Sequence, residues 1–461
     1  QVWLNSCVFR SHLYFRSGTC VKAMLTSILR GALLALAAMA WEEESPDTVT
    51  LLQRFHDTMA DKNSMDMEAM KARMAEMEAQ MATMKDQMAQ MTQMTQMAMG
   101  TDGSSQDESD PRTPVIIDTD VDTDDQMAIA YLLAQPDFRV LAITVGCNGW
   151  SQQWAGVMSI MRLTKYFGQP DIPVAFSFRY NPDTQLNLNE PNGLPDPTLL
   201  TGKGNFLSEF VGLPFNIRPP SWMYTGRLLT ETLWKSARKV DIIALGPLTN
   251  LAHFLQDSPR LFYLKVNRIY NSGGTVVSRS STPTDKVWPY SAPDTSVTGN
   301  PPDTEWNIFS DPVAANSVLS FGVPIALATS TYTDGMQFYL NDTDFIPASC
   351  DADRAAVVTK MVLTLPTADG EEPSDLRYWD ESAMVLFVQM IRNGGKAQAA
   401  VCTEWETKRF AVMLEAGNNA SVSGGQYSRL LENEFGQEAV QCMTGDLTEF
   451  KIAYFEGFCS R

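Results

Sequence analysis

The sequence predicts an α/β domain with a mainly parallel open sheet flanked by helices, preceded by a helical coiled-coil segment. Beyond about residue 113, short apolar runs rich in β-branched residues lead into helical patterns, as in repeated strand-helix units. Methionines recur at heptad spacing between residues 67 and 91. A polar, glycine-containing stretch at residues 100–112 separates the two parts and predicts a flexible linker.

Residues 1–40 predict a leader that ends in a secretory signal. Met24–Ala40 combines a basic residue, an apolar stretch and an A-x-A end, which is typical of a signal peptide cleaved before Trp41. A signal anchor that stays in the membrane is the alternative, but the apolar stretch is short for a membrane span. We therefore expect a secreted, extracellular protein without stable membrane association.

Residues 41–99 form a methionine-rich segment. Its methionines alternate spacings of three and four residues, at Met67, Met70, Met74, Met77, Met81, Met84, Met88 and Met91. This spacing is a heptad seam, and it predicts a helix that supercoils with other copies of the chain into a homo-oligomer. A methionine cluster that binds Cu(I) is the alternative. The heptad register accounts for the spacing without it.

Residues 113–455 are predicted to form one folded domain, and its acidic start is the main clue to function. Val115–Ile117 suits a buried strand, and Met127, Ile129, Leu132 and Leu133 suit the inner stripe of the helix that follows. Between them stand Asp118, Asp120, Asp122, Asp124 and Asp125. The carboxyl ends of parallel strands form the ligand-binding edge of an open sheet. Aspartates gathered there favour an oxygen-seeking cation such as Ca²⁺.

Two other cation or phosphate motifs also begin with this pattern. An EF-hand loop requires glycine at its sixth position and glutamate at its twelfth, where this chain has Thr123 and Ile129, so that class is excluded. A haloacid-dehalogenase-type phosphatase would use Asp118 as nucleophile and Asp120 as acid/base. Its later lysine and paired-aspartate motifs have no convincing counterpart in this chain.

Composition narrows the class of ligand. The 461 residues carry a net charge of −19, and 44% of them are hydrophobic. We find no cluster of lysine and arginine of the kind that binds phosphate backbones, so a nucleic-acid partner is not expected. A stretch of about 340 residues is long enough to bury one large core.

Further motifs follow in a fixed order, and together they resemble a known family. They are DIIALGPLTNLA at Asp241–Ala252, NSGG at Asn271–Gly274, EWNIFSDP at Glu305–Pro312, YWDES at Tyr378–Ser382, and a closing hairpin pattern at residues 409–426. With the D-x-D-x-x-x-D-D pattern that starts at Asp118, they resemble the inosine–uridine preferring nucleoside hydrolases across Pro111–Ala453. The resemblance implies a ribonucleoside N-glycosidase that acts on a small-molecule ribonucleoside.

The resemblance also implies roles for particular residues. The calcium ligands would be Asp120, Asp125, the backbone carbonyl of Leu245, and Asp380, and Asp120 would also act as general base toward the attacking water. Asp124, Asn148 and Asn307 would hold the ribose hydroxyls, and Glu305 with Asn300 would face the 5′ side. The spacing from Asn300 to Glu305 is one residue shorter than is usual in the family.

One position departs from the family pattern. Many members carry histidine immediately before the last metal-binding aspartate, as acid for the leaving base, whereas this chain has Trp379. Its three histidines are His12, His56 and His253, and none follows that pattern. Trp379 is therefore expected to stack on the base while water protonates it. The alternatives are plain core packing of Trp379 and a non-catalytic riboside-binding protein of the same fold.

Several polar residues have structural interpretations beside the functional ones. Asp118 and Asp122 are expected to cap or buttress the acidic loop, and Asp311 to cap the helix that Pro312 opens. Asn250 is expected to be a buried residue that bonds the backbone, and an N-cap is the alternative role for Asp380.

Cysteines and glycosylation sequons fit secretion. Cys402, Cys442 and Cys459 are close enough along the chain for one disulfide among them. Asn341 and Asn419 begin N-glycosylation sequons.

Overall fold

The computed structural model describes residues 109–146, 150–151, 153–176, 203–214, 224–277, 305–412 and 429–460. The leader, the methionine-rich segment and most of the linker lie outside these residues, as do Cys147 and the sequon at Asn419. Secretion and coiled-coil assembly therefore stay predictions. Within the described residues, no helix is long and apolar enough to cross a membrane.

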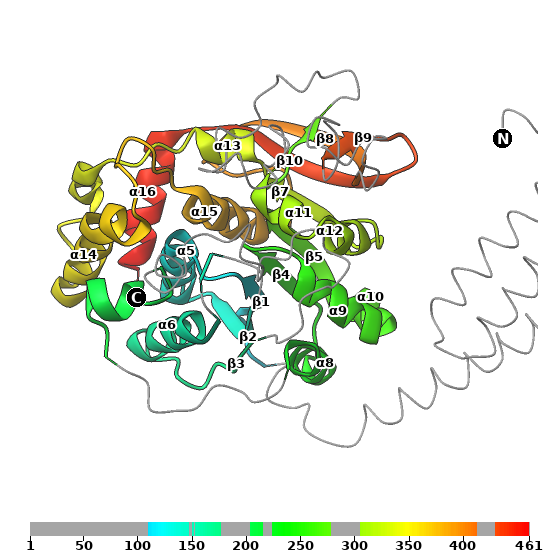
Figure 1. Ribbon diagram of the computed structural model, residues 1–461, viewed down its shortest axis with the longest axis horizontal. Coiled ribbons are helices and arrows are strands. Elements are labelled where there is room, and N and C mark those ends of the chain that lie inside the picture. Colours follow the sequence, from blue (N-terminus) through cyan, green and yellow to red (C-terminus); the bar gives the residue numbers. More distant parts are fainter. Residues whose placement is uncertain are drawn as a thin grey trace, which may run out of the picture. The chain divides into compact units, whose positions relative to one another are not determined.

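A single twisted sheet organises the described domain (Figure 1). Its strands are β1 (Thr113–Thr119), β2 (Phe138–Val145), β3 (Val174–Phe176), β4 (Val240–Ala244), β5 (Val266–Ser272), β6 (Val276–Val277), β7 (Ile325–Ala328), β8 (Cys402–Val412), β9 (Leu430–Glu432) and β10 (Gln437–Gly445). They lie in the order β3-β2-β1-β4-β5-β7-β10-β8-β9-β6. All neighbours are parallel except β8, which is antiparallel to both β10 and β9. The expected mainly parallel sheet is confirmed.

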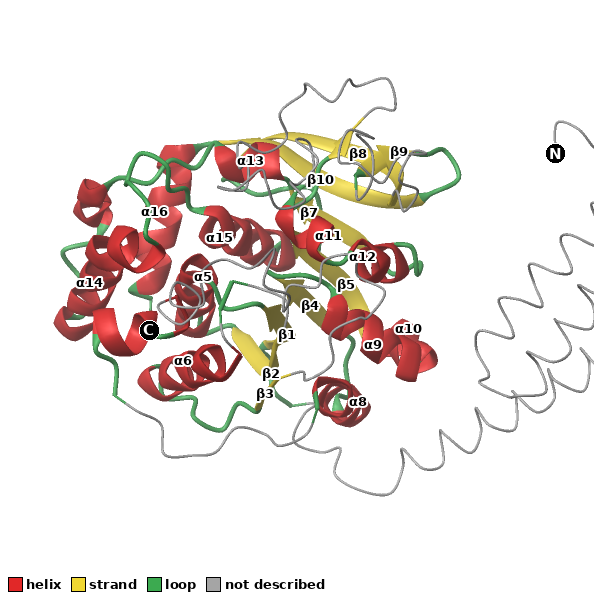
Figure 2. Cartoon of the chain, in the orientation of Figure 1, coloured by secondary structure: helices red, strands yellow, loops and turns green. Residues whose placement is uncertain are grey.

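Helices cover both faces of this sheet (Figure 2). They are α5 (Thr123–Ala134), α6 (Gln153–Tyr166), the π-helix η1 (Phe206–Val211), α8 (Thr225–Lys235), α9 (Thr249–Asp257), α10 (Pro259–Lys265), α11 (Trp306–Ser310), α12 (Pro312–Leu319), α13 (Ser330–Asp334), the 3₁₀ helix η2 (Leu340–Phe345), α14 (Ala352–Asp369), α15 (Trp379–Arg392) and α16 (Leu447–Phe458). Helices α5, α6, α14, α15 and α16 lie on one side, and α8, α9, α10 and α12 lie on the other.

Strand β1 is central and buried on both faces. Val115 and Ile117 contribute to the core under α5 and α15, whereas Ile116 belongs to the core under α9 and α12. Side chains alternate across a strand, so a strand covered on both sides needs apolar residues at every position. This explains why the apolar run preceding the aspartates is continuous.

Helix α5 corrects one expectation from the sequence. We expected Met127, Ile129, Leu132 and Leu133 to form an inner stripe, but every residue of Asp125–Ala134 is buried. The helix lies within a layer of helices, in contact with α15, α16 and α6 as well as with the sheet. A helix enclosed in this way has no solvent face for periodicity to reveal.

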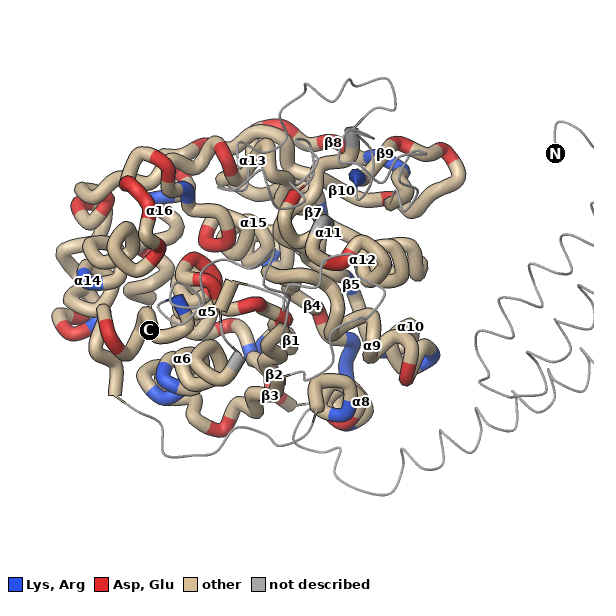
Figure 3. The backbone as a smooth tube through the Cα atoms, viewed as in Figure 1, with Lys and Arg blue, Asp and Glu red and all other residues tan. Residues whose placement is uncertain are grey.

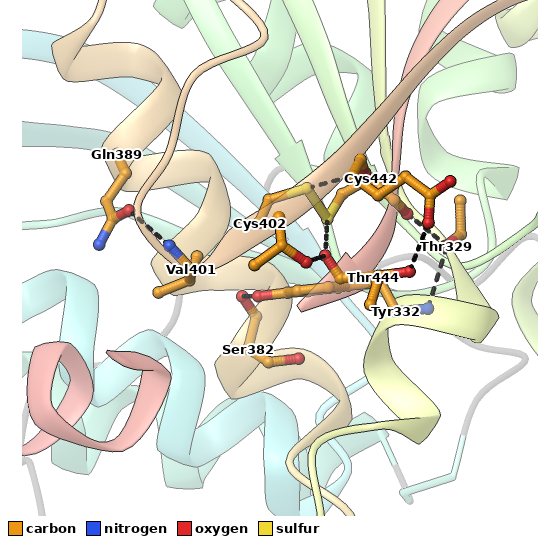
Figure 4. Close-up of a disulfide and its surroundings, with 10 residues drawn as sticks. Thr329, Tyr332, Ser382, Gln389, Val401, Cys402, Cys442 and Thr444 are labelled. Carbon is orange, nitrogen blue, oxygen red and sulfur yellow. Dashed lines mark hydrogen bonds between the residues drawn. A yellow bond between two sulfur atoms is a disulfide. The ribbon is translucent and has the colours of Figure 1, made fainter. Parts of the chain in front are cut away.

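Two disulfides close the C-terminal part of the domain. One joins Cys402 on β8 to Cys442 on β10, next to the Thr329 hydroxyl, which donates to the Cys442 carbonyl (Figure 4). The second joins Cys350, just before α14, to Cys459, just after α16. The expected single bridge among the last three cysteines is confirmed, and Cys350 supplies an additional one.

Candidate active site

The aspartates sit at the carboxyl end of β1, at the edge where α5 begins. Val121 has a φ of 60°, the single positive value for a residue other than glycine in the described chain. A β-branched residue in this conformation is strained, and it turns the chain sharply between Asp120 and Asp122. Asp122 then caps α5, and its own backbone N–H donates to Asp125 Oδ2 at 2.9 Å. The reciprocal capping box fixes Asp125 at the start of the helix.

Three carboxylates from two distant segments converge. One ligand oxygen each from Asp124, Asp125 and Asp380 lies within 4.8 Å of the others. The Asp120 carboxyl joins them, because it lies close enough to Asp125 and Asp380 for its charge to raise the pKa of both. Asp380 lies in the first turn of α15, not at the N-cap, and accepts a 2.6 Å hydrogen bond from the Ser272 hydroxyl.

These carboxyl groups are too close together to be ionised without a counter-charge. Burial first, and then repulsion from the neighbouring carboxylates, raises the pKa of Asp124 and of Asp125 well above the usual range. Burial likewise raises the pKa of Asp120 and Asp380. A set of oxygen donors with this much negative charge fits a hard divalent cation such as Ca²⁺, which would keep the groups ionised.

The end of β4 supplies a backbone oxygen to the same place. The Leu245 carbonyl accepts a 2.8 Å hydrogen bond from the Asn307 side-chain amide. Next to it, a Cβ added to Gly246 would lie 2.8 Å from the Asp120 backbone nitrogen, so only glycine permits this approach. The structure thus places Leu245 and Asn307 beside the acidic loop.

Glu305 is held at the start of α11. Its Oε1 accepts the Asn307 backbone N–H at 2.8 Å, and its Oε2 accepts the Ile308 N–H at 3.1 Å. Burial raises the pKa of Glu305 to about 8. Gly273, with a φ of 96°, lies against this carboxyl, and an added Cβ would come within 2.3 Å of the Glu305 Cδ. The NSGG turn therefore makes room for Glu305.

A cavity at the carboxyl edge of the sheet contains these groups. Its empty space, open solvent at the mouth included, is about 700 Å³. It is lined by Asp120, Asp122, Asp124, Asp125, Trp150, Lys203, Leu245, Ser272, Gly273, Glu305, Trp306, Asn307, Ser330, Thr333, Asp369, Glu371, Trp379 and Asp380. Every expected site residue within the described part of the chain lines it, whereas Asn148 and Asn300 lie outside that part. The acidic segments that meet there stand out around the start of α5 in Figure 3.

Aromatic side chains form much of the wall. Trp379 is half-buried, and its indole N–H donates to Asp334 Oδ1 at 3.2 Å. Trp150 and Trp306 lie with their ring centroids 4.6 Å apart. Flat apolar surfaces beside a polar floor suit a ligand with an aromatic base at one end and a polyhydroxylated part at the other.

Lys203, Asp369 and Glu371 are site residues that the sequence did not reveal. Lys203 Nζ contacts Asp122 Oδ2 at 2.9 Å and Asp369 Oδ1 at 2.7 Å. None of the three residues belongs to a recognisable motif, and Lys203 is 81 residues from Asp122 in the chain. Only the packing of η1 and α14 against α6 and α5 brings them to the cavity.

The structural roles expected for the neighbouring polar residues are confirmed for some of them and corrected for others. Asp118 is a buttress outside the cavity lining, and its Oδ1 accepts from Thr144 Oγ1 at 2.6 Å and from Asn250 Nδ2 at 2.8 Å. Asn250 is buried as expected, but within the described residues it bonds side chains, donating to Asp118 and accepting from Thr225. Asp311 caps α12 as expected, with Pro312 at the first helical position. His253 lies on α9 and does not line the cavity.

Comparison with known proteins agrees with this geometry. The family described as inosine-uridine preferring nucleoside hydrolase matches residues 115–428. The pyrimidine-specific ribonucleoside hydrolase RihA of Salmonella enteritidis is 27% identical over 241 residues, which is 50% of this chain and 64% of the relative. RihA of Escherichia coli is 28% identical over 235 residues, with the same coverage. The chain thus spans less than two thirds of the length of these relatives.

Solved structures share the fold. A plant nucleoside hydrolase superposes with a TM-score of 0.57 at 20% identity, and covers 76% of this chain and 100% of its own. The inosine-uridine preferring nucleoside hydrolase of Bacillus anthracis gives 0.58 at 17% identity, with the same coverage. The family match covers more than half of the chain and includes the acidic loop, the glycine turns and the start of α15. The chain belongs to the inosine-uridine preferring nucleoside hydrolase family.

Proposed function

We propose that the domain hydrolyses the N-glycosidic bond of ribonucleosides, giving ribose and a free base. The observation that carries this proposal is the convergence of Asp120, Asp125 and Asp380 beside the Leu245 carbonyl, on the floor of a cavity with aromatic walls. Relatives named as ribonucleoside hydrolases support it. The acidic lining favours a nucleoside over a nucleotide, because a phosphate would meet carboxylates there.

We propose Ca²⁺ as the resident ion, held by Asp120, Asp125, Asp380 and the Leu245 carbonyl. All four positions offer oxygen, which calcium prefers over nitrogen and sulfur ligands. When bound, the ion would orient the ribose hydroxyls and make a nearby water easier to deprotonate. Asp124, whose carboxyl joins the same cluster, and Asn307 would hold the ribose hydroxyls, while Glu305 would face the 5′ side.

Asp120 would serve as the general base. It takes a proton from the attacking water as the water oxygen bonds to the anomeric carbon, and the electrons of the C–N bond leave with the base. Its carboxylate is positioned by the backbone N–H of Trp150, which donates to Oδ2 at 3.3 Å. Trp379 would stack on the base, since its indole is fixed through the hydrogen bond to Asp334.

A nucleoside panel with the mature chain tests this function. Free base detected by chromatography, and lost on addition of EGTA, is the expected result. A second candidate is a non-catalytic riboside-binding protein, which the absence of histidine before Asp380 favours. In that case calorimetry would record heat of riboside binding while chromatography found no free base.

We further propose that the protein is secreted as a homo-oligomer. Two disulfides in the described domain support an oxidising compartment, because cytosolic thiols are kept reduced. The heptad seam at Met67–Met91 supports assembly through the N-terminal segment. Light scattering of the mature chain with and without residues 41–110 tests the second point. An unchanged mass would assign the interface to the catalytic domain.

A further inference from the structure

The leaving base needs a proton, and no residue of this chain has yet been assigned to deliver it. A nucleobase leaves poorly as an anion, so its departure is much faster when an acid delivers a proton to it. Trp379 occupies the position before Asp380, and its indole N–H, already bonded to Asp334, is not an acid. The sequence leaves this proton to water, whereas a carboxylic acid in the cavity wall would deliver it more effectively.

We propose that Glu371 is the general acid that protonates the leaving base. The inference rests on the proposed N-ribohydrolase function and identifies a catalytic residue for it. Glu371 lines the same cavity as Trp379 and the carboxylates of the candidate metal site. It comes from the segment that follows α14, which carries no motif of the family resemblance.

The end of α14 directs Glu371 toward the cavity. Gly370 ends the helix in the left-handed conformation with a φ of 78°, and its backbone N–H donates to the Pro366 carbonyl at 2.9 Å. The Glu371 N–H donates to the same carbonyl at 3.2 Å. This left-handed glycine ends the helix, so the residue after it leaves the helix axis.

A buried ionic network holds that turn in place. Lys203 Nζ bridges Asp122, at the start of α5, and Asp369, at the end of α14. The Thr123 hydroxyl also donates to Asp369 Oδ1, at 3.0 Å. Burial lowers the pKa of Lys203, but the two aspartates outweigh it and raise the pKa overall, so the ammonium stays charged. The segment of Glu371 is thereby anchored to the helix that carries Asp124 and Asp125.

The carboxyl group of Glu371 is free to act on a ligand. Its Oε2 is buried and has no hydrogen-bond partner among the described residues. Burial raises its pKa, Lys203 lowers it, Asp375 raises it and Arg377 lowers it, with a net upward shift. A base entering the cavity would displace more water and push the equilibrium further toward the protonated acid.

Two other carboxyl groups are poorer candidates for this step. Both oxygens of Glu305 already accept backbone N–H groups at the start of α11. Asp334 has a pKa raised by burial to about 6, but it does not line the cavity, and its Oδ1 accepts from Trp379. Glu371 combines a place in the wall with an oxygen that the described chain does not use.

The proposed step balances. As the bond between the anomeric carbon and the base nitrogen breaks, its electron pair goes to the base, and the Glu371 carboxylic acid transfers its proton to a nitrogen or oxygen of that base. The attacking water gives its hydroxyl to the anomeric carbon and its proton to Asp120. Solvent then returns a proton to Glu371 and accepts one from Asp120, so the net reaction consumes one water.

The experiment compares Glu371→Gln with the matched control Glu372→Gln, which changes an exposed residue on the same turn. Substrates are inosine, uridine and p-nitrophenyl riboside, whose phenolate leaves without protonation. For Glu371→Gln we expect kcat/KM to fall roughly 10²–10⁴-fold on both nucleosides and by less than about threefold on p-nitrophenyl riboside. Glu372→Gln should behave as the unaltered protein, and calcium titration should be the same for all three proteins.

The pH profile provides a second readout. Because the acid must be protonated, kcat/KM of the unaltered protein on inosine should decline as the pH rises through the Glu371 pKa. Glu371→Gln should lack this decline. Equal losses on nucleosides and p-nitrophenyl riboside, or no loss on either, would overturn the assignment of Glu371 alone. If the unaltered protein releases neither base nor nitrophenolate, both the assignment and the proposed function are wrong.

Discussion

The side-chain amide of Asn307 donates a hydrogen bond to the backbone carbonyl of Leu245 at 2.8 Å. This contact joins a residue expected to hold the ribose to an oxygen expected to bind the metal. The two parts of the site are therefore not independent. A change at Asn307 should affect the ion as well as the sugar.

Asn307→Ala should weaken calcium binding and raise KM together. Loss of one hydrogen bond to a neutral partner is worth about 0.5–1.5 kcal/mol, or roughly 2- to 10-fold in each equilibrium. Isothermal calorimetry with Ca²⁺ and steady-state kinetics measure the two effects. Asn316→Ala on α12, away from the cavity lining, is the control. A raised KM with unchanged calcium affinity would mean that the Leu245 carbonyl is not a ligand.

Asp125→Ala should abolish tight calcium binding and hydrolysis. Asp125 lies close to Asp120 and Asp380, whose charges raise its pKa. Removing it should weaken the metal by more than the roughly 10–100-fold that loss of an outer-shell partner costs. Asp353→Ala, at an exposed position on α14, is the matched control. An unchanged calcium titration in Asp125→Ala would remove this residue from the site.

Substitutions at Trp379 should separate stacking from hydrogen bonding. Trp379→Phe keeps an aromatic face but loses the N–H that bonds Asp334, whereas Trp379→Ala loses both. Stacking on a base is worth about 1–3 kcal/mol, so Trp379→Ala should raise KM for nucleosides roughly 5- to 150-fold. Trp379→Phe should have a much smaller effect. Similar kinetics for the alanine variant and the unaltered protein would favour plain core packing.

Glu305 should make the stability of the calcium-free domain depend on pH. Burial raises its pKa from the ordinary 4.5 to about 8, so the folded state binds a proton that the unfolded state releases. The stabilisation is full below about pH 4.5 and is lost as the pH rises through about 8, with a slope of up to about 1.4 kcal/mol per pH unit. Urea unfolding in EGTA between pH 5 and 8 measures this decline.

The matched variant for that experiment is Glu305→Gln, which stays neutral at every pH. Its unfolding free energy should decline less steeply than that of the unaltered protein over the same range. Equal slopes would show that other buried carboxyls, such as Asp118 with its pKa raised by burial to about 7, account for the pH dependence.

Local patterns along the chain determined the main features of the fold. The continuous apolar run of Val115–Ile117 indicated a buried strand, which the structure covers on both faces, and the acids directly after it indicated the ligand-binding edge. The family motifs DIIALGPLTNLA and NSGG also contain Gly246 and Gly273, which stand where an added Cβ would strike Asp120 or Glu305. These features depend on neighbours within a few residues, which periodicity and turn chemistry describe.

The resemblance to the family also predicted which residues far apart in the chain would meet in the site. Asp380 meets Asp125 although 255 residues separate them, and no spacing rule could have paired them without the motif order. Neither local patterns nor the resemblance predicted that α5 is buried on all sides. Its enclosure depends on α15 and α16, which are more than 200 residues away.

The sequence by itself therefore determined the sheet, the acidic edge and the residues that carry the family pattern. Only the tertiary structure decided the opposite wall of the cavity, where Lys203 bridges Asp122 and Asp369 and the turn after Gly370 places Glu371. A lone lysine and a glutamate after a helix are ordinary surface residues in any linear pattern. They become site residues because burying the helices against one another brings their charges together where water is excluded, and that outcome depends on the whole fold.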